Sequence, residues 1–379
     1  MITVAEVDRI INENHLSLGT EQIPFETSLG RVLKENVLAD RDFPPFDRVM
    51  MDGIAIRYSD WQRQVRSFSI AGLQAAGDPA SQLEKQGDCI EVMTGAILPL
   101  GTDTVIKYEE VELSDGIALV SSDSLVKQQQ HVHKKGADRL ERDVLIKEDT
   151  IIGPAELAIL ATVGKIHVEV ATLPKVAVVA TGDELVDVDA TPAQHQIRKS
   201  NVYELQAGLK EKGIASKIYH YVDDKTTLRA GLEQVLEEHD IVVLSGGVSK
   251  GKLDYVPEIL EDLGVQKLFH KVMQRPGKPF WFGRHEQAVV FALPGNPVST
   301  FVGLIRYVLP FIGESMGIKS KVVRARLSED FTFKPNLTYF LQVLLEYDAD
   351  GHLNARPAPG HGSGDLANLV DTDAFIELP

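Results

Sequence analysis

Residues 241–254 read Ile241-Val-Val-Leu-Ser-Gly-Gly-Val-Ser-Lys-Gly-Lys-Leu-Asp254, and this stretch decides the expected fold. An apolar run typical of a buried strand ends at paired glycines, and hydroxyl, cationic and carboxylate side chains follow it. Glycine-rich strand ends can direct several backbone N–H groups at one phosphate. The stretch therefore predicts a buried strand that delivers backbone amides to an anion.

Two further segments repeat this plan. The apolar run from Val176 to Thr181 leads into Gly182-Asp183-Glu184, and the run from Val289 to Leu293 leads into Pro294-Gly295-Asn296-Pro297. One such turn is a weak signal, since glycine also ends strands for steric reasons. Three turns together predict an anion site, and the residues expected to bind the anion are Ser245, Gly246, Gly247, Ser249, Pro294, Gly295, Asn296 and Pro297.

The pattern around these turns predicts the fold class. From about residue 173 to residue 317, strand and helix patterns alternate, as in a parallel sheet covered by helices on both faces. We expect Ser200-Asn201 to cap one helix, and Pro297 to start a long apolar helix that runs through Val308. Ligands of such sheets bind at the carboxyl ends of the strands, where all three glycine turns lie. We therefore expect a multidomain α/β protein with a doubly wound parallel sheet.

The flanking regions have a different texture. Thr3-Val-Ala-Glu6 fits a capping box at the start of a first helix. Short β-like runs broken by Gly, Pro and Asp extend from about residue 40 to residue 135, and a helix with Pro154 in its first turn follows. If the two helices pack together, the β region is an insertion in a discontinuous domain. Alternating strands from about residue 320 onward predict a small closing β domain.

Composition limits the class of protein. A chain of 379 residues is too long for one ordinary core, and 44% hydrophobic with 25% charged residues is typical of soluble globular proteins. The chain starts without a basic or apolar leader, and no run approaches the ~18 apolar residues of a membrane helix. We therefore expect a cytoplasmic protein without a membrane partner. The single cysteine, Cys89, excludes an internal disulfide; strand filler is favoured over a lone catalytic thiol.

The charge is unevenly distributed. The formal net charge of -16 argues against a general nucleic-acid binder. Residues 245–284 nevertheless hold seven basic and four acidic residues, a net +3, which leaves -19 for the rest of the chain. A solvated basic face is the alternative interpretation. Within this cationic segment, Arg275-Pro-Gly-Lys278 fixes two cations on a proline-flanked turn, which favours oxyanion binding.

Several carboxylates fall in turns after strands of the same region: Asp183, Glu184, Asp223, Asp224 and Asp254. Carboxylates beside a phosphate repel it unless a hard cation stands between them, and Mg²⁺ typically takes one or two carboxylates plus phosphate oxygens. We predict Glu184 and Asp254 as the metal ligands. Asp183 or Asp224 is expected to be a helix cap or a solvated turn residue.

The β region offers weaker signals. Taken alone, Asp52 is a turn former and Thr94 a strand-end hydroxyl. The eleven histidines show no ligand spacing, and His131 and His133, two apart in a polar loop, are expected to be solvated.

Together these segments resemble the molybdopterin molybdenumtransferase family, which includes bacterial MoeA and the E domains of gephyrin and its plant counterpart. The resemblance covers nearly the whole chain in order. Its markers are Asp42-Phe-Pro-Pro-Phe-Asp47 with Met51-Asp-Gly53, Met93-Thr-Gly95, Gly136-Ala-Asp138, Thr181-Gly-Asp-Glu-Leu185, Ser200-Asn201, Ser245-Gly-Gly-Val-Ser249 with Asp254-Tyr255, Arg275-Pro-Gly-Lys-Pro-Phe280 and Leu293-Pro-Gly-Asn-Pro-Val-Ser299.

The resemblance implies a four-domain subunit and a homodimer. We place a discontinuous helical domain at residues 1–40 and 137–171, an inserted β domain at 41–136, the molybdopterin-binding α/β domain at 172–319 and a C-terminal β domain at 320–379. The family implies an active site shared between the sheet domain of one subunit and the β domain of the other. A molybdopterin adenylyltransferase is a candidate partner.

The reaction that the resemblance implies takes adenylated molybdopterin and molybdate, uses Mg²⁺ as cofactor, releases AMP and leaves molybdenum on the dithiolene. By position, Glu184 and Asp254 would form the Mg²⁺ and phosphate centre. Arg275 and Lys278 would receive molybdate or phosphate. The remaining implied site residues are Asp52 and Thr94 from the facing β domain, Asp138 and Asp223 on the rim, Pro294 and Pro297 around the pocket, and Ser363 on a loop of the last domain.

Some positions differ from the usual family pattern. Ile54 replaces a common aromatic residue, Arg275 replaces a common Lys, Ala137 replaces a common Glu, and His133 stands where an Arg is usual. Two other functions stay open as alternatives. One is the adenylyl transfer that precedes molybdenum insertion, and the other is a catalytically weak binding or scaffold protein.

Overall fold

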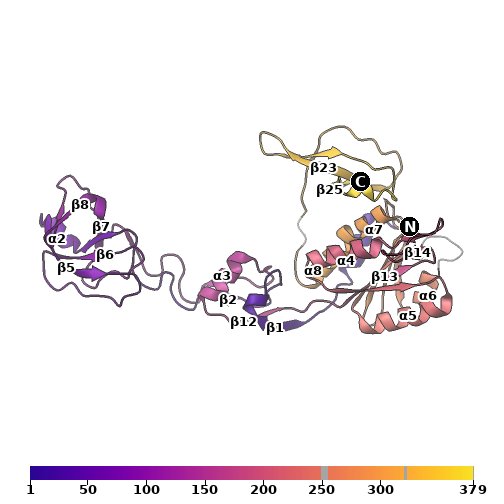
Figure 1. The fold of residues 1–379 in the computed structure, drawn as a ribbon, viewed down its shortest axis with the longest axis horizontal. Helices are drawn as coiled ribbons and strands as arrows, with labels where there is room; N and C mark the ends of the chain where they lie inside the picture. Colours follow the sequence, from indigo (N-terminus) through magenta and orange to yellow (C-terminus); the bar gives the residue numbers. More distant parts are fainter. Residues whose placement is uncertain (249–254, 320–321, 379) are drawn as a thin grey trace. The chain divides into compact units, whose positions relative to one another are not determined.

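The computed structural model describes residues 1–248, 255–319 and 322–378. The chain forms two compact units, one made of residues 1–35, 149–157 and 167–379 and the other of residues 36–148 and 158–166 (Figure 1). The expected finer division into four domains stays a prediction. In the described part of the chain, no helix combines the length and the apolar character that a membrane crossing requires.

The first unit is built on a six-stranded sheet. Its strands, in spatial order, are β16 (Ser216–Tyr221), β13 (Val176–Thr181), β17 (Ile241–Ser245), β21 (Val289–Leu293), β20 (Trp281–Arg284) and β18 (Gln266–His270). The first four strands are parallel, as predicted, whereas β20 runs antiparallel to β21 and β18 runs antiparallel to β20. Every residue of β13, β17 and β21 is buried, which explains their continuous apolar sequences.

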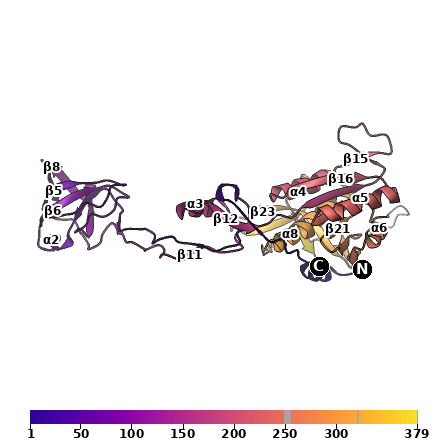
Figure 2. The same ribbon diagram turned by 90° about the horizontal axis from the view of Figure 1, so that it is seen from below.

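Helices cover both faces of this sheet. They are α4 (Asn201–Glu211), α5 (Lys225–Glu238), α6 (Val256–Asp262), α7 (Pro297–Gly303) with its continuation through the π-helix η3 (Leu304–Val308), and α8 (Leu309–Ser315). Val176 and Val178 of β13 face one apolar core, and Ala177 and Val179 face another. Figure 1 shows α4, α7 and α8 on one side of the sheet and α5 and α6 on the other; Figure 2 gives the perpendicular view. The doubly wound prediction is confirmed.

The N-terminal flank belongs to the same unit. Helix α1 (Val4–Asn12) begins with the predicted capping box between Thr3 and Glu6, and its apolar face joins the core of the sheet. Strand β1 (Thr20–Pro24) pairs with β12 (His167–Ala171), so that two distant parts of the sequence meet. The short 3-10 helix η1 (Phe25–Thr27) follows β1, and the paired strands β14 (Leu185–Val186) and β15 (Ile197–Arg198) lie between β13 and α4.

A five-stranded sheet closes the chain, as expected. It contains β22 (Arg326–Leu327), β23 (Thr338–Tyr347), β24 (Leu353–Pro357) and β25 (Ala374–Leu378), with η4 (Ala367–Leu369) in a connection. Its remaining strand is β19 (Gln274–Arg275), which pairs in parallel with β23. The proline-flanked turn of the cationic segment is therefore tied to the C-terminal sheet.

The second unit is mostly β, as predicted. Its six-stranded sheet has the order β7 (Thr104–Lys107), β4 (Gly53–Ile56), β6 (Asp88–Val92), β5 (Ser67–Gln74), β9 (Ile117–Val120) and β8 (Val111–Ser114). Two pairs of short strands accompany it, β2 (Val37–Leu38) with β11 (Val144–Ile146) and β3 (Arg48–Val49) with β10 (Val132–His133). Its helical elements are α2 (Tyr58–Gln62) and η2 (Tyr108–Glu110). Helix α3 (Pro154–Thr162) starts at the proline that predicted it, and its residues are divided between the two units.

Candidate functional site

The three glycine turns meet at one edge of the large sheet. Their strands β13, β17 and β21 are neighbours in parallel register, so all three carboxyl ends lie together. The backbone N–H of Gly246 donates to the carbonyl of Leu293 at 3.1 Å. A Cβ on Gly246 would lie 2.9 Å from the carbonyl oxygen of Thr181, and a Cβ on Gly295 would lie 3.6 Å from Cα of Gly246. The turns therefore approach so closely that only glycine fits between them at position 246, where φ is +105°.

The side chain of Asn201 fastens two of these turns. Its amide nitrogen lies 2.9 Å from Oγ of Ser245 and 2.8 Å from the carbonyl oxygen of Gly295. Ser200 occupies the predicted N-cap position of α4, but its side chain makes no capping hydrogen bond. Sequence reasoning also missed Thr300, whose buried hydroxyl donates to the carbonyl of Pro294 at 2.7 Å. A hydroxyl in the first turn of an apolar helix was the only signal for it.

The turn from Arg275 to Lys278 lines a cavity of about 500 Å³ beside the third glycine turn. The backbone N–H of Val272 donates to the carbonyl of Lys278 at 2.9 Å and closes the turn. Both cationic side chains are exposed, and within residues 1–248, 255–319 and 322–378 neither makes a hydrogen bond or an ion pair. Two neighbouring cations with no partner among the described residues favour the binding of an anion.

The C-terminal sheet and its loop form the opposite wall of this cavity. Ser363 meets the third glycine turn, since the side-chain amide of Asn296 donates to its Oγ at 2.7 Å and the N–H of Val298 donates to its carbonyl at 3.1 Å. Ser363 thus lies beside Asn296, and Pro294 shares the cavity with them. Sequence reasoning missed other lining residues, namely Tyr339 and Gln342 of β23 and His361 of the loop after β24, because a strand or loop pattern does not tell which side chains meet a pocket.

The carboxylates divide into fixed and exposed groups. Asp224 caps α5 by accepting a hydrogen bond from the N–H of Thr227 at 2.9 Å. This backbone hydrogen bond is the main reason that the pKa of Asp224 lies below its ordinary value. Asp183 accepts from the N–H of Asp223 at 3.0 Å, which links the turns after β13 and β16. The prediction that one of these two residues serves as a cap is confirmed for Asp224.

Of the two predicted metal ligands, the structure describes only Glu184. Glu184 is exposed in the turn after β13, with its carboxylate folded over Gly182. Among the described residues, that carboxylate has no hydrogen bond or ion pair. Asp254, like Ser249 of the second glycine turn, lies outside the described residues.

In the second unit, Asp52 and Thr94 form a pair. One carboxylate oxygen of Asp52 accepts from the Thr94 hydroxyl at 2.7 Å and from the Thr94 N–H at 2.6 Å. These two hydrogen bonds hold the pKa of Asp52 below its ordinary value, and the bond from the hydroxyl has the larger effect. Asp52 is therefore an oriented, ionised carboxylate at neutral pH, and its pairing with Thr94 goes beyond a turn-forming role.

His133 is not solvated as expected. Strand pairing of β10 with β3 sets it beside Arg48, and its Nδ1 lies 3.1 Å from the Arg48 guanidinium. Its Nε2 lies 3.0 Å from a carboxylate oxygen of Asp138. The prediction of a solvated histidine is thus wrong at this position, because Arg48, His133 and Asp138 form one polar chain.

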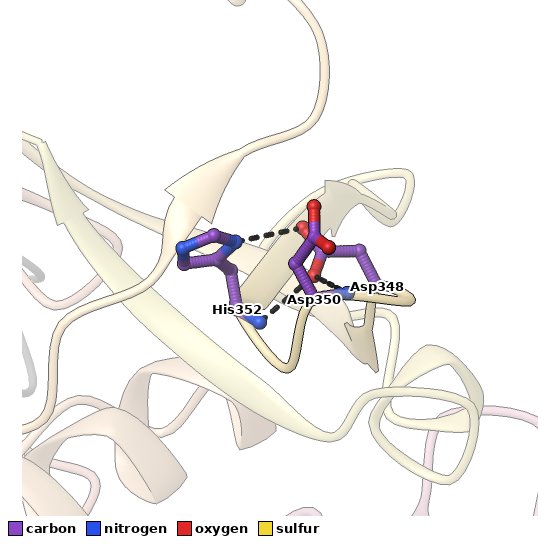
Figure 3. A group of neighbouring side chains, drawn as sticks. All are labelled: Asp348, Asp350 and His352. Atoms are coloured by element: carbon purple, nitrogen blue, oxygen red, sulfur yellow. Dashed lines mark hydrogen bonds and ion pairs between the residues drawn. The ribbon is translucent and has the colours of Figure 1, made fainter.

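A cluster outside the cavity superficially resembles a metal site. Among the described residues, one group of three histidine, cysteine or acidic side chains has its ligand atoms within 4.8 Å of one another. It consists of Asp348, Asp350 and His352 (Figure 3). All three are exposed in the turn between β23 and β24. Asp348 accepts from the N–H groups of Asp350 at 3.0 Å and of His352 at 2.8 Å. These bonds account for the arrangement as a hairpin turn.

Family profiles match three regions of the chain. The MoeA N-terminal region (domain I and II) matches residues 2–164, a probable molybdopterin binding domain matches residues 177–314, and the MoeA C-terminal region (domain IV) matches residues 324–379. The second of these contains the three glycine turns and the cationic turn.

Individual relatives agree with this match. A molybdopterin molybdenumtransferase of Synechocystis sp. is 40% identical over 383 residues, which cover 100% of this chain and 96% of that protein. A molybdopterin molybdenumtransferase of Staphylococcus aureus is 32% identical over an alignment that covers 98% of this chain and 90% of that protein. The crystal structure of a molybdopterin biosynthesis MoeA protein from Pyrococcus horikoshii has a TM-score of 0.83 at 29% identity and covers 100% of this chain and 95% of that one. The chain therefore belongs to the MoeA family of molybdopterin molybdenumtransferases.

Proposed function

We propose that this protein is a molybdopterin molybdenumtransferase that inserts molybdate into adenylated molybdopterin and releases AMP. One observation carries the proposal: the exposed cations Arg275 and Lys278 line a cavity beside converging glycine turns. The names of the relatives support the same substrate class. A polyanionic substrate suits this combination of cations and close backbone approach.

The residues of the cavity suggest how the charge of the substrate is handled. Arg275 offers a planar pair of donors to a tetrahedral oxyanion, and Lys278 offers a compact charge. Asn296 and Ser363 add polar groups on the facing wall. When the phosphoanhydride breaks, fixed cations stabilise the charge that develops on the departing AMP phosphate.

We propose Mg²⁺ as the cofactor, held by Glu184 together with Asp254. The exposed Glu184 carboxylate fits such an ion, because it is a hard oxygen ligand at the mouth of the first glycine turn. Bound Mg²⁺ would neutralise phosphate charge. Asp223, adjacent to Asp183, is proposed to contribute to the acidic rim.

We further propose a homodimer in which the second unit of one subunit contributes residues to the active site at the cavity of the other subunit. The ionised Asp52 with Thr94, and Asp138 with His133, are the groups of the second unit that carry over from the family pattern. The cytoplasmic location and a molybdopterin adenylyltransferase partner remain predictions.

The test is direct. Purified protein is incubated with adenylated molybdopterin, Mg²⁺ and molybdate, while AMP release and metal incorporation are followed. We expect molybdate-dependent AMP release, lost in Asp254→Ala and retained in the matched exposed-carboxylate control Asp350→Ala. Release of AMP that does not depend on molybdate would contradict the proposal. ATP-dependent adenylation of free molybdopterin would instead favour the adenylyltransferase alternative, and a folded protein without metal-dependent nucleotide binding would favour the scaffold.

A further inference from the structure

Gln274, the residue before the cationic turn, is buried inside that turn. Only 2% of its surface is exposed. Its side-chain amide nitrogen lies 3.1 Å from the carbonyl oxygen of Pro276 and 3.3 Å from that of Gly277. One planar amide therefore holds both carbonyl groups between Arg275 and Lys278.

Tyr307 sets the orientation of this amide. Because the nitrogen of Gln274 is used for the turn, its carbonyl oxygen needs a donor from elsewhere, and the Tyr307 hydroxyl donates to it at 2.5 Å. Tyr307 lies in the π-helix η3, is 1% exposed, and packs its ring 5.0 Å from the ring of Phe280. The hydroxyl is thus anchored in the core of the sheet.

The backbone of the turn packs closely against the side-chain amide of Gln274. Gly277 has a φ of +87°, and a Cβ there would lie 2.7 Å from the amide nitrogen of Gln274. A shift of the amide would move the Pro276–Gly277 backbone, and the two cations attached on either side would separate or turn. Bidentate recognition of a small oxyanion depends strongly on such geometry.

We propose that Gln274 and Tyr307 are positioning residues that hold Arg275 and Lys278 in the arrangement that binds a tetrahedral oxyanion. The proposal deepens the proposed function and rests on it, since molybdate is the oxyanion tested. Neither residue touches the anion; both act through the turn.

The experiment measures molybdate binding by titration calorimetry with the full chain, with and without adenylated molybdopterin, and the KM and kcat for molybdate. The variants are Gln274→Met, Tyr307→Phe and the double variant, with Tyr347→Phe as a control that removes a hydroxyl from a tyrosine that is 75% exposed. We expect each single variant to weaken molybdate binding by about tenfold and to raise KM for molybdate while kcat at saturation is kept. The double variant should be no worse than the worse single variant, because both changes release the same amide.

Some outcomes would overturn the inference. Unchanged molybdate affinity with a lower melting temperature would mean a purely structural pair, and fully additive losses would mean two independent residues. Should Gln274→Met fail to fold, Tyr307→Phe, which removes one oxygen atom, decides alone. If the unaltered protein binds molybdate but releases no AMP, the proposed function fails while the positioning role is still judged by binding. No binding of molybdate to the unaltered protein under either condition would overturn both.

Discussion

Glu204 in helix α4 carries an ionisable side chain in an unusual environment. The structure buries both of its carboxylate oxygens without a hydrogen-bond partner among the described residues. Burial of this kind depends on how α4 packs against the strands and helices around it, which no local sequence pattern encodes.

Glu204 should make stability depend on pH. Burial raises its pKa to about 8, well above the value near 4.3 that an unfolded chain gives it. The folded state therefore prefers the protonated form, and its contribution is complete below about pH 4 and lost as pH rises through about 8. We expect Glu204→Gln to raise the melting temperature at pH 9 and to change it little at pH 5. Glu211→Gln, exposed on the same helix, is the control, and equal effects of the two variants at pH 9 would contradict the burial argument.

The Asp52 and Thr94 pair leads to a second prediction for a residue. Thr94→Val removes the hydroxyl donor and leaves the backbone donor, so the pKa of Asp52 should rise only part of the way toward its ordinary value. Because the folded pKa is depressed, the pair stabilises the protein above about pH 4, and this contribution fades as pH falls below that value. A carboxylate NMR titration measures the shift. In Thr102→Val, which loses a hydroxyl bonded to Pro99 instead, the pKa of Asp52 should stay unchanged.

At the scale of elements, the buried strands and the convergence of their carboxyl ends were predictable, whereas the antiparallel edge of the sheet was not. Continuous apolar runs identified β13, β17 and β21, whose carboxyl ends converge as expected. Strands β18 and β20 run antiparallel, and their short connection through the cationic turn gave no clear sign of this. The π-helix η3 could not be predicted from the sequence either. The apolar stretch from Pro297 predicts a helix but does not determine its hydrogen-bond spacing.

The close approach of the first two strand ends gives a prediction at this scale. Gly246→Ala places a methyl group 2.9 Å from the carbonyl oxygen of Thr181 and demands a backbone angle that alanine rarely adopts. We expect a loss of about 1–3 kcal/mol in the free energy of unfolding. Denaturant unfolding measures it. Gly72→Ala in β5, where a Cβ would have no heavy atom within 4 Å, should change stability far less. A similar loss in both variants would argue against the steric explanation.

At the scale of the molecule, the family pattern and the fold agree, while the connections between distant segments came only from the structure. Asp8 of α1, Arg306 of η3 and Glu377 of β25 form one network, in which Arg306 donates to both Asp8 oxygens at 2.9 and 2.8 Å and to Glu377 at 2.9 Å. Single charged residues at such separations carry no sequence signal. The network joins the beginning, middle and end of the first unit.

Breaking that network should loosen the C-terminal sheet. Arg306→Met leaves two carboxylates without their cation, and we expect a loss of roughly 1–3 kcal/mol in unfolding free energy with faster amide hydrogen exchange in β25. Arg9→Met breaks the exposed pair with Glu13 and should cost less than about 0.5 kcal/mol. Unchanged exchange in β25 would show that the sheet is held by its strands alone.

The pairing of β2 with β11 has a consequence for how such a protein can be built and altered. Val37 and Ile146 are direct neighbours, so the long segment 38–145 of the second unit begins and ends at adjacent antiparallel strands. Joining ends that already lie side by side costs little loop-closure entropy. We therefore expect that residues 38–145 can be removed and bridged by a short linker, or exchanged with the matching segment of a relative, while the sheet that holds the glycine turns stays intact.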